Sequence, residues 1–177
     1  MRIIAGKHRS RVLKEFSGRD IRPTSDRAKE AIFNILQTKI YGSSFLDLFA
    51  GTGNVGLEAL SRGAERVVLV DNSKESVALC GKNAEMLKES PDIVFSDARA
   101  FVENCREKFD IVFLDPPYGV DASDVADRIV ERGLLKENGV IIYEHSESFS
   151  VKPAKTAEKT DERRYGAAGF TFYGEKK

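Results

Sequence analysis

Four residues near the middle of the chain, Asp115-Pro116-Pro117-Tyr118, form a group that can hold an amine. They follow the apolar run 111–114, which predicts a buried strand. The prolines have no backbone N–H, so the segment offers carbonyl oxygens and the Asp115 carboxylate as acceptors. An amine held by Asp115 and the Pro116 carbonyl can aim its lone pair at an electrophilic carbon while Tyr118 stacks on its base. The carboxylate can stabilise the charge that develops on nitrogen and accept the proton that leaves.

A glycine-rich turn after the apolar run 45–49 predicts a nucleoside site. Gly51 and Gly53 allow a tight turn and close approach to a ligand, and Gly56 lets the following helix pack closely on its strand. Asp71 ends the next apolar run, where a carboxylate can accept hydrogen bonds from both hydroxyls of a ribose. The turn alone is also compatible with a nicotinamide or flavin cofactor.

Two further acids favour a different nucleoside. Asp47 lies inside the first predicted strand, where its charge suits a cationic amino group, as in a methionine-like moiety, better than a pyrophosphate. Asp97 follows the third predicted strand and can accept a hydrogen bond from an adenine amino group, with the Ala98 amide meeting a ring nitrogen. Asp97 can at the same time cap the helix that follows it.

These residues need a framework that gathers strand ends at one edge of a sheet. Strands are predicted at 45–49, 67–70, 93–95, 111–114 and 140–143. Helices are predicted between them, at 54–62, 73–88, 98–107 and 123–132. Alternation of this kind is typical of an α/β fold with a doubly wound, mostly parallel, Rossmann-like sheet.

The two ends of the chain depart from this alternation. A turn at 163–166 and an alternating strand at 169–174 predict an antiparallel C-terminal hairpin at a sheet edge. At the other end, residues 2–5 and 11–14 predict a small β-hairpin. A helix follows it, capped by Thr24 or Ser25.

Charge is divided unevenly along the chain. The formal net charge is zero, but residues 1–40 hold ten Lys and Arg against four acids, which gives +6 there and −6 in the rest. This asymmetry predicts that a basic extension over 1–40 contacts a polyanion and precedes an acidic body over 41–177, although a solvated basic hairpin is the plain alternative. The candidates for contact with a polyanion backbone are Lys7, Arg9 and Arg11.

The remaining composition narrows the class of protein. With 177 residues, one hydrophobic core is the default. Cys80 and Cys105 form no CxxC pair, which argues against a disulfide framework or a zinc site. No apolar run approaches the roughly 18 residues that span a bilayer. We therefore expect a reduced, cytoplasmic protein that does not bind membranes. We also expect a monomer.

Four blocks of the sequence together resemble one enzyme family. MRIIAGKHRSR, IRPTSDRAKEAIFN, FLDLFAGTGNVGLEALSRGA and FLDPPY are similar to the RsmD family of class I methyltransferases, which act on the N2 amine of a guanine in 16S ribosomal RNA. The resemblance implies a seven-stranded sheet, S-adenosylmethionine as methyl donor with S-adenosylhomocysteine as product, and no metal. The implied partner is 16S rRNA, the small ribosomal subunit or one of its assembly intermediates.

The resemblance also implies roles for individual residues. The cofactor would contact Asp47, Gly51, Gly53, Asp71, Asn72, Asp97 and Ala98. The target guanine would be held by Asp115, Pro116 and Tyr118, and the RNA by Lys7, Arg9, Arg11 and Arg22. Ser10 and Asn54 depart from the family pattern, which has Gly and a small residue there.

Other functions remain compatible with parts of the sequence. The Asp-Pro-Pro-Tyr chemistry alone permits methylation of a DNA adenine amine, and a basic arm on a cofactor fold would also suit a noncatalytic ribosome assembly factor. A nicotinamide-dependent oxidoreductase is a more distant alternative.

Overall fold

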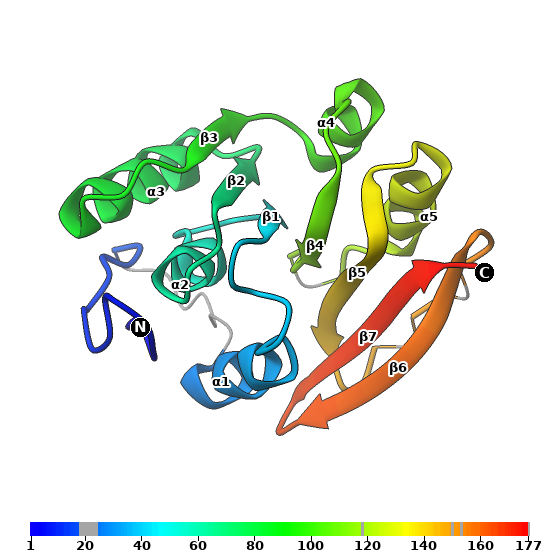
Figure 1. Cartoon of the computed structure of the whole chain (residues 1–177), viewed down its shortest axis with the longest axis horizontal. Helices are drawn as coiled ribbons and strands as arrows, with labels where there is room; N and C mark the ends of the chain where they lie inside the picture. The colour runs from blue at the N-terminus through cyan, green and yellow to red at the C-terminus, as the bar shows by residue number, and fades with distance from the viewer. Residues whose placement is uncertain (18–24, 118, 150, 153, 177) are drawn as a thin grey trace.

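The computed structural model (Figure 1) describes residues 1–17, 25–117, 119–149, 151–152 and 154–176. Over these residues the strands are β1 (Ser44–Leu48), β2 (Arg66–Asp71), β3 (Asp92–Phe95), β4 (Phe109–Leu114), β5 (Leu135–Ser146), β6 (Ala157–Tyr165) and β7 (Ala168–Glu175). They form one seven-stranded sheet in the order β3-β2-β1-β4-β5-β7-β6. β1 to β5 are parallel, and β7 pairs antiparallel with β5 and β6. The predicted parallel sheet with an antiparallel C-terminal hairpin is confirmed.

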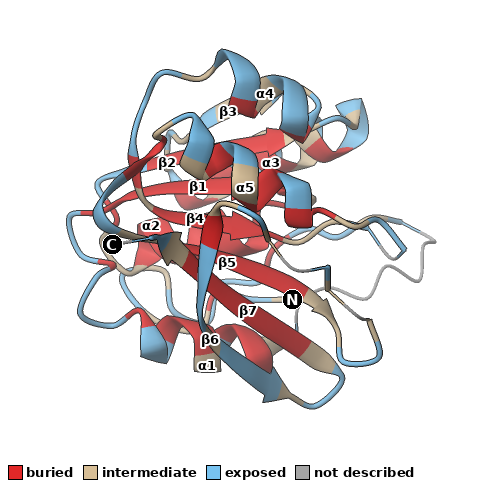
Figure 2. Ribbon diagram, turned by 90° about the vertical axis from the view of Figure 1, so that its right-hand side faces the viewer, coloured by how far each residue is buried: buried red, intermediate tan, exposed pale blue. Residues whose placement is uncertain are grey.

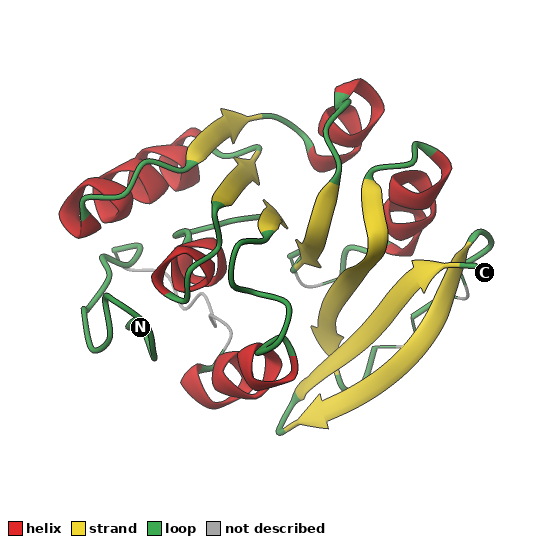
Figure 3. Ribbon diagram, in the orientation of Figure 1, coloured by secondary structure: helices red, strands yellow, loops and turns green. Residues whose placement is uncertain are grey.

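Helices cover both faces of this sheet (Figures 1 and 3). In the described part of the chain they are α1 (Asp26–Ile35), α2 (Asn54–Ser61), α3 (Lys74–Leu87), α4 (Ala98–Asn104) and α5 (Ser123–Glu131). Buried residues of α1, α2 and α3 pack into one apolar cluster, and those of α4 and α5 pack into a second one. The sheet therefore has a helical layer on each side, which is the doubly wound arrangement.

Local sequence explains where the helices begin and end. The Ser25 hydroxyl accepts a hydrogen bond from the Ala28 amide and caps α1, while Thr24, the other predicted cap, lies outside the described residues. Ser73 caps α3 in the same manner. α4 ends at Asn104 rather than at residue 107, because Cys105 adopts an extended backbone with ψ of 142°.

The central strands are buried on both faces, as Figure 2 shows. Every residue of β1 is buried, including one acid, Asp47. Two-sided burial accounts for the near-continuous apolar runs in the sequence. β5 extends from Leu135 to Ser146, beyond the apolar run 140–143, because its later residues pair with β7.

Residues 1–17, termed the arm below, form the small hairpin that was predicted, with one antiparallel bridge between Arg2 and Val12 and backbone hydrogen bonds from the Ile3 amide to Arg11 and from the Leu13 amide to Met1. The pairing between the two segments of the arm stays short because neighbouring amides form hydrogen bonds with α2 instead. The amides of Ile4 and Ala5 donate to the Glu58 carboxylate on α2, at 2.7 and 3.0 Å. The arm is therefore held by a helix of the main fold as well as by its own backbone hydrogen bonds.

A close approach between the arm and α2 explains the glycine at position 6. A Cβ there would lie 1.8 Å from the Ser61 carbonyl oxygen, and the backbone has a φ of +82°. The next two amides, of Lys7 and His8, donate to the Ser61 carbonyl and hydroxyl. Ser10 has a φ of +69°, which is the region where glycine is preferred.

The contact between arm, α1 and α2 centres on a buried ion pair. Lys29 and Glu58 are 1% and 0% exposed, and Lys29 Nζ lies 3.1 Å from Glu58 Oε2. Arg62 also donates to Glu58, at 2.7 Å. Losing one partner of such a pair typically costs about 3–5 kcal/mol, since the other charge stays buried.

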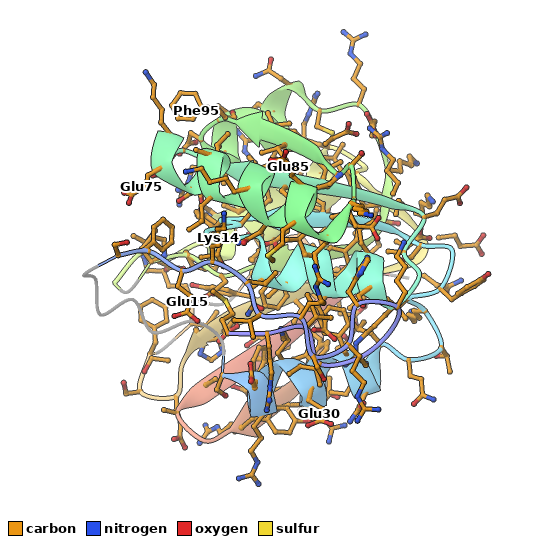
Figure 4. All side chains as sticks on the ribbon, turned by 90° about the vertical axis from the view of Figure 1, so that its left-hand side faces the viewer. Lys14, Glu15, Glu30, Glu75, Glu85 and Phe95 are labelled. Atoms are coloured by element: carbon orange, nitrogen blue, oxygen red, sulfur yellow. The ribbon has the colours of Figure 1, made fainter. Side chains whose placement is uncertain are left out.

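Apolar contacts join the arm to the same core. Ile3 and Leu13 of the arm belong to the apolar cluster that contains Phe33 of α1 and Phe45 of β1. Figure 4 shows the arm, with Lys14 and Glu15 labelled, running between α3 above and α1 below. Residues 1–17 and 25–40 therefore share one core with the sheet.

Candidate active site

A cavity of about 700 Å³ opens at the carboxyl ends of the parallel strands. This is the edge beside the point where the chain order reverses between β1 and β4, where open α/β sheets bind ligands. Segments after β1, β2 and β4, the end of β5 and the β6–β7 turn all contribute to its lining. Among the lining residues are Asp47, Gly51, Asp71, Asn72, Asp115 and Pro116.

The turn after β1 is strained and firmly held. Phe49 has a φ of +72°, which is unusual for a bulky side chain, and Gly51 and Gly53 have φ values of +56° and +79°. The amides of Phe49 and Ala50 both donate to the Val70 carbonyl at the end of β2. Strain of this kind is found mainly where a site needs a fixed backbone shape.

Gly56 keeps α2 against the strands. A Cβ at this position would lie 2.2 Å from a methyl group of Leu69 and 3.3 Å from Asp47 Oδ2. The close packing allows the Gly56 amide to donate to Asp47 Oδ2 at 3.0 Å. The third glycine of the loop therefore positions an acid of the site as well as a helix.

Asp47 is 2% exposed, and its carboxyl group is the most deeply placed acid of the cavity lining. Burial raises the pKa of this carboxyl well above its usual range. The Gly56 hydrogen bond lowers the pKa, and the nearby charges of Asp115 and Asp71 raise it. A cationic group in the cavity would relieve this repulsion, which fits the amino group expected from the sequence.

Asp71 joins the loops after β1 and β2. Its Oδ2 accepts from the Gly51 amide and its Oδ1 from the Ser73 amide, each at 2.8 Å. A carboxylate has about four acceptor positions, so both oxygens can still receive hydroxyl donors. Asp71 and Asn72 both line the cavity, at the place where a ribose was expected.

Asp97 and Ala98 are placed differently. The Asp97 carboxylate caps α4 by accepting from the amides of Arg99 and Ala100, at 2.9 and 3.1 Å. Neither Asp97 nor Ala98 is among the described lining residues. The capping role foreseen for Asp97 is present, and its contact with an adenine stays a prediction.

Asp115, Pro116 and Pro117 leave the end of β4, next to the end of β1, and line the same cavity as the glycine turn. Asp115 lies close enough to Asp47 for its charge to act on that carboxyl group. Tyr118 and Arg22 lie outside the described residues. The acceptor-only segment and the nucleoside loop therefore face one cavity.

Sequence reasoning missed the far wall of this cavity. Glu144 and His145 of β5, Phe149, and Tyr165 at the end of β6 all line it. The sequence held one signal for this wall. Glu144 directly follows the apolar run 140–143, just as Asp71 and Asp115 directly follow the runs 67–70 and 111–114. The wall adds a buried carboxylate and two aromatic rings to the site.

Three of the predicted RNA-contacting residues, Lys7, Arg9 and Arg11, lie outside the described cavity lining. Lys7 pairs with Glu89 of the loop after α3, with a distance of 2.6 Å between Nζ and Oε1. Arg11 donates to the Met86 carbonyl, and Arg9 is exposed. Their side chains lie on the outer surface of the arm, where a polyanion can reach them.

Asn54 connects the arm to the glycine loop. Its Oδ1 accepts from Lys29 Nζ at 2.6 Å, and Lys29 Nζ also donates to the Arg2 carbonyl at 2.6 Å. The Nδ2 of Asn54 is buried and has no hydrogen-bond partner in the described structure. The other residue that was expected to depart from the family pattern, Ser10, has a φ of +69°, in the region where glycine is preferred.

The described residues contain neither a cluster of metal-binding side chains nor a helix suited to a bilayer. No group of three or more His, Cys, Asp or Glu residues there is arranged to hold a metal ion. Within the same part of the chain, no helix has the length and apolar character needed to cross a bilayer.

Comparison with known proteins places the chain among methyltransferases. A family model described as conserved hypothetical protein 95 matches residues 1–174. Ribosomal RNA small subunit methyltransferase D of Haemophilus influenzae is 35% identical over 98% of this chain and 93% of its own length. The protein of the same name from Escherichia coli is 34% identical over 83% and 75%. A solved Escherichia coli structure superposes with a TM-score of 0.86, at 31% identity, over 99% of this chain and 97% of the other.

The burial of Asp47 predicts a gain in stability when its charge is removed. In the wild type, the unfolded chain releases the Asp47 proton near the ordinary pKa of 3.8, whereas the folded protein retains it to a higher pH. Wild-type stability therefore falls as pH rises between these two values. Asp47→Asn has no proton to lose and can still accept from the Gly56 amide. The free energy of unfolding of D47N minus that of the wild type should therefore be positive and grow with pH.

Urea unfolding of both proteins without ligand, at intervals between about pH 5 and pH 8, measures this difference. A difference that stays constant or shrinks as pH rises would contradict the account of Asp47.

Proposed function

The chain belongs to the family described as conserved hypothetical protein 95, and on this premise we propose that it transfers a methyl group from S-adenosylmethionine to the N2 amine of a guanine in 16S ribosomal RNA. The observation that carries the proposal is the placement of Asp115 and Pro116 in the same cavity as Asp47 and Asp71. One half of that cavity suits a nucleoside with a cationic amino group, and the other half offers acceptors to an amine. The names of the curated relatives supply the RNA as substrate.

The residues present fit the cofactor. Asp47 is the partner for the methionine amino group, Gly51 and Gly53 allow backbone approach, and Asp71 with Asn72 receives the ribose. Asp97 and Ala98 are the proposed adenine contacts at the start of α4. When bound, S-adenosylmethionine supplies a methyl group whose carbon is already electrophilic, so the reaction needs no metal.

The chain's own contribution to the chemistry is to position the amine and to offset the positive charge that develops on its nitrogen. Asp115 and the Pro116 carbonyl accept hydrogen bonds from the amine hydrogens and thereby orient its lone pair. As the nitrogen becomes positive, the Asp115 carboxylate stabilises it and can accept the released proton. Tyr118 is proposed to stack on the base.

RNA binding is proposed to involve residues 1–40, with 41–177 as the methyltransferase domain. Lys7, Arg9 and Arg11 would contact phosphates, and Arg22 either a phosphate or the cofactor. Because the arm is hydrogen-bonded to α2, its cations are held at a fixed distance from the cavity. The substrate would be the RNA itself, the small subunit or an assembly intermediate, met by a monomer in the cytoplasm.

Replacing the acceptor carboxylate should stop methyl transfer without preventing cofactor binding. Asp115→Asn and Asp115→Ala should lower the rate by roughly 100-fold to 1000-fold, since transition-state stabilisation of this kind has that magnitude. Radiolabel transfer from S-adenosylmethionine to small-subunit RNA measures the rate, and calorimetry measures cofactor affinity. Full activity in either variant would contradict the mechanism.

The matched control for this experiment is Glu107→Gln. Glu107 is an exposed acid that pairs with Arg66 at the opposite end of the sheet, and its removal should leave the rate unchanged. Labelling of duplex DNA in place of ribosomal RNA would favour the adenine methyltransferase alternative.

Neutralising the arm should change how salt affects RNA affinity. Each lost phosphate contact lowers the slope of log affinity against log salt by about 0.7 for single-stranded nucleic acid, so Lys7→Ala, Arg9→Ala and Arg11→Ala together should lower it by roughly 2. Filter binding over a series of salt concentrations gives the slope.

The control neutralises three exposed lysines of the C-terminal region, Lys155, Lys159 and Lys176, and should leave the slope unchanged. Equal slopes for the arm variant and the wild type would mean that the arm is only a solvated surface loop.

A further inference from the structure

We propose that Glu144 recognises the base by accepting a hydrogen bond from guanine N1–H, and so makes the enzyme select guanine over bases that lack this donor. The inference rests on the proposed function, because it concerns the base whose N2 amine is methylated. Glu144 would act as a specificity-determining residue beside Asp115.

The register of the sheet places the two acids side by side. Leu114 of β4 pairs with Tyr143 of β5, and the next residue on each strand is an acid, Asp115 and Glu144. Neighbouring strands lie about 4.8 Å apart, so the two carboxylates start from adjacent backbone positions. Both residues line the cavity.

Glu144 is set into the wall rather than on the rim. It is 8% exposed, and on its other side it pairs with Phe170 of β7. Phe149 and Tyr165 line the same part of the cavity and offer apolar surface to a base. An ionised carboxylate accepts hydrogen bonds and donates none, so at this position it can receive a donor from a base that enters the cavity.

The hydrogen-bonding pattern of guanine matches a pair of adjacent acceptors. Its N1–H and its N2 amine are neighbouring donors on the Watson–Crick edge, the edge by which unstacked bases are read. Asp115 and Pro116 receive the amine, which leaves N1–H for the acid on the next strand. Adenine presents an unprotonated N1 acceptor on this edge, and a carboxylate placed against it would repel it.

The experiment compares two target bases that share the N2 amine. The substrate is small-subunit RNA, in whichever form the wild type methylates, with the methylated guanosine either kept or replaced by 2-aminopurine. 2-Aminopurine has the same amine but an N1 acceptor in place of N1–H, and a hydrogen in place of the O6 oxygen, so the E144Q variant isolates the contribution of N1. The full chain is used, and kcat/KM is measured for both substrates.

The kcat/KM of the wild type should be roughly 10-fold to 100-fold higher for guanine, which is the usual discrimination that one well-formed contact with a base edge provides. Glu144→Gln should reverse much of this preference, because its amide can donate to the N1 of 2-aminopurine. The absolute rate on guanine should fall while the rate on 2-aminopurine holds or rises. A residue with a merely structural role would lower both rates together.

Controls separate recognition from folding. Glu147→Gln changes an exposed acid that pairs with Arg164 shortly after β5, and its guanine preference should equal that of the wild type. Cofactor affinity by calorimetry reports whether E144Q is folded. If that variant does not fold, the wild-type comparison still decides, since equal use of the two bases by the wild type overturns the inference.

The outcomes also distinguish this inference from the proposed function. Methylation of guanosine with an unchanged preference in a folded E144Q protein would overturn the role of Glu144 alone. Failure of the wild type to methylate any guanosine of the RNA would overturn both.

Discussion

Burial of the Asp47 carboxyl group constrains the residues that surround it in the cavity. The acid lies inside a central parallel strand, and Gly56 has to be a glycine for α2 to come close enough to donate to it. The same strand order places Asp71 and Asp115 where their charges act on it. A buried carboxylate destabilises the folded protein when no ligand is bound, and it stabilises the complex with a cationic ligand. This balance is expected at a binding site, where some stability of the free protein is lost in favour of ligand affinity.

A second buried charge, Glu58, attaches the arm to this framework. Glu58 receives two arm amides and Lys29, and Lys29 in turn reaches Asn54 at the start of α2. The arm is thereby connected to the glycine loop through side chains that are almost wholly buried. A net charge of zero therefore conceals a basic surface fixed next to an acidic cavity.

What could be predicted from the sequence depended on how local each signal is. The parallel strands, the glycine turn and the Asp97 cap follow from neighbouring residues, and they were predicted. Glu144 and Tyr165 were missed because their place in the site depends on how β5 and β7 pair, which no short segment encodes. The arm was predicted as a small hairpin, but its sequence does not reveal that Glu58, more than fifty positions later, accepts hydrogen bonds from two of its amides.

We propose that the acids at this sheet edge direct a methyl group to the N2 amine of one guanine in ribosomal RNA. The decisive experiment is mass-spectrometric mapping of modified nucleosides in small-subunit RNA from cells with and without this protein. A single N2-methylguanosine should be lost in cells that lack the protein. An unchanged map, or the loss of a methylated adenosine in its place, would contradict the proposal.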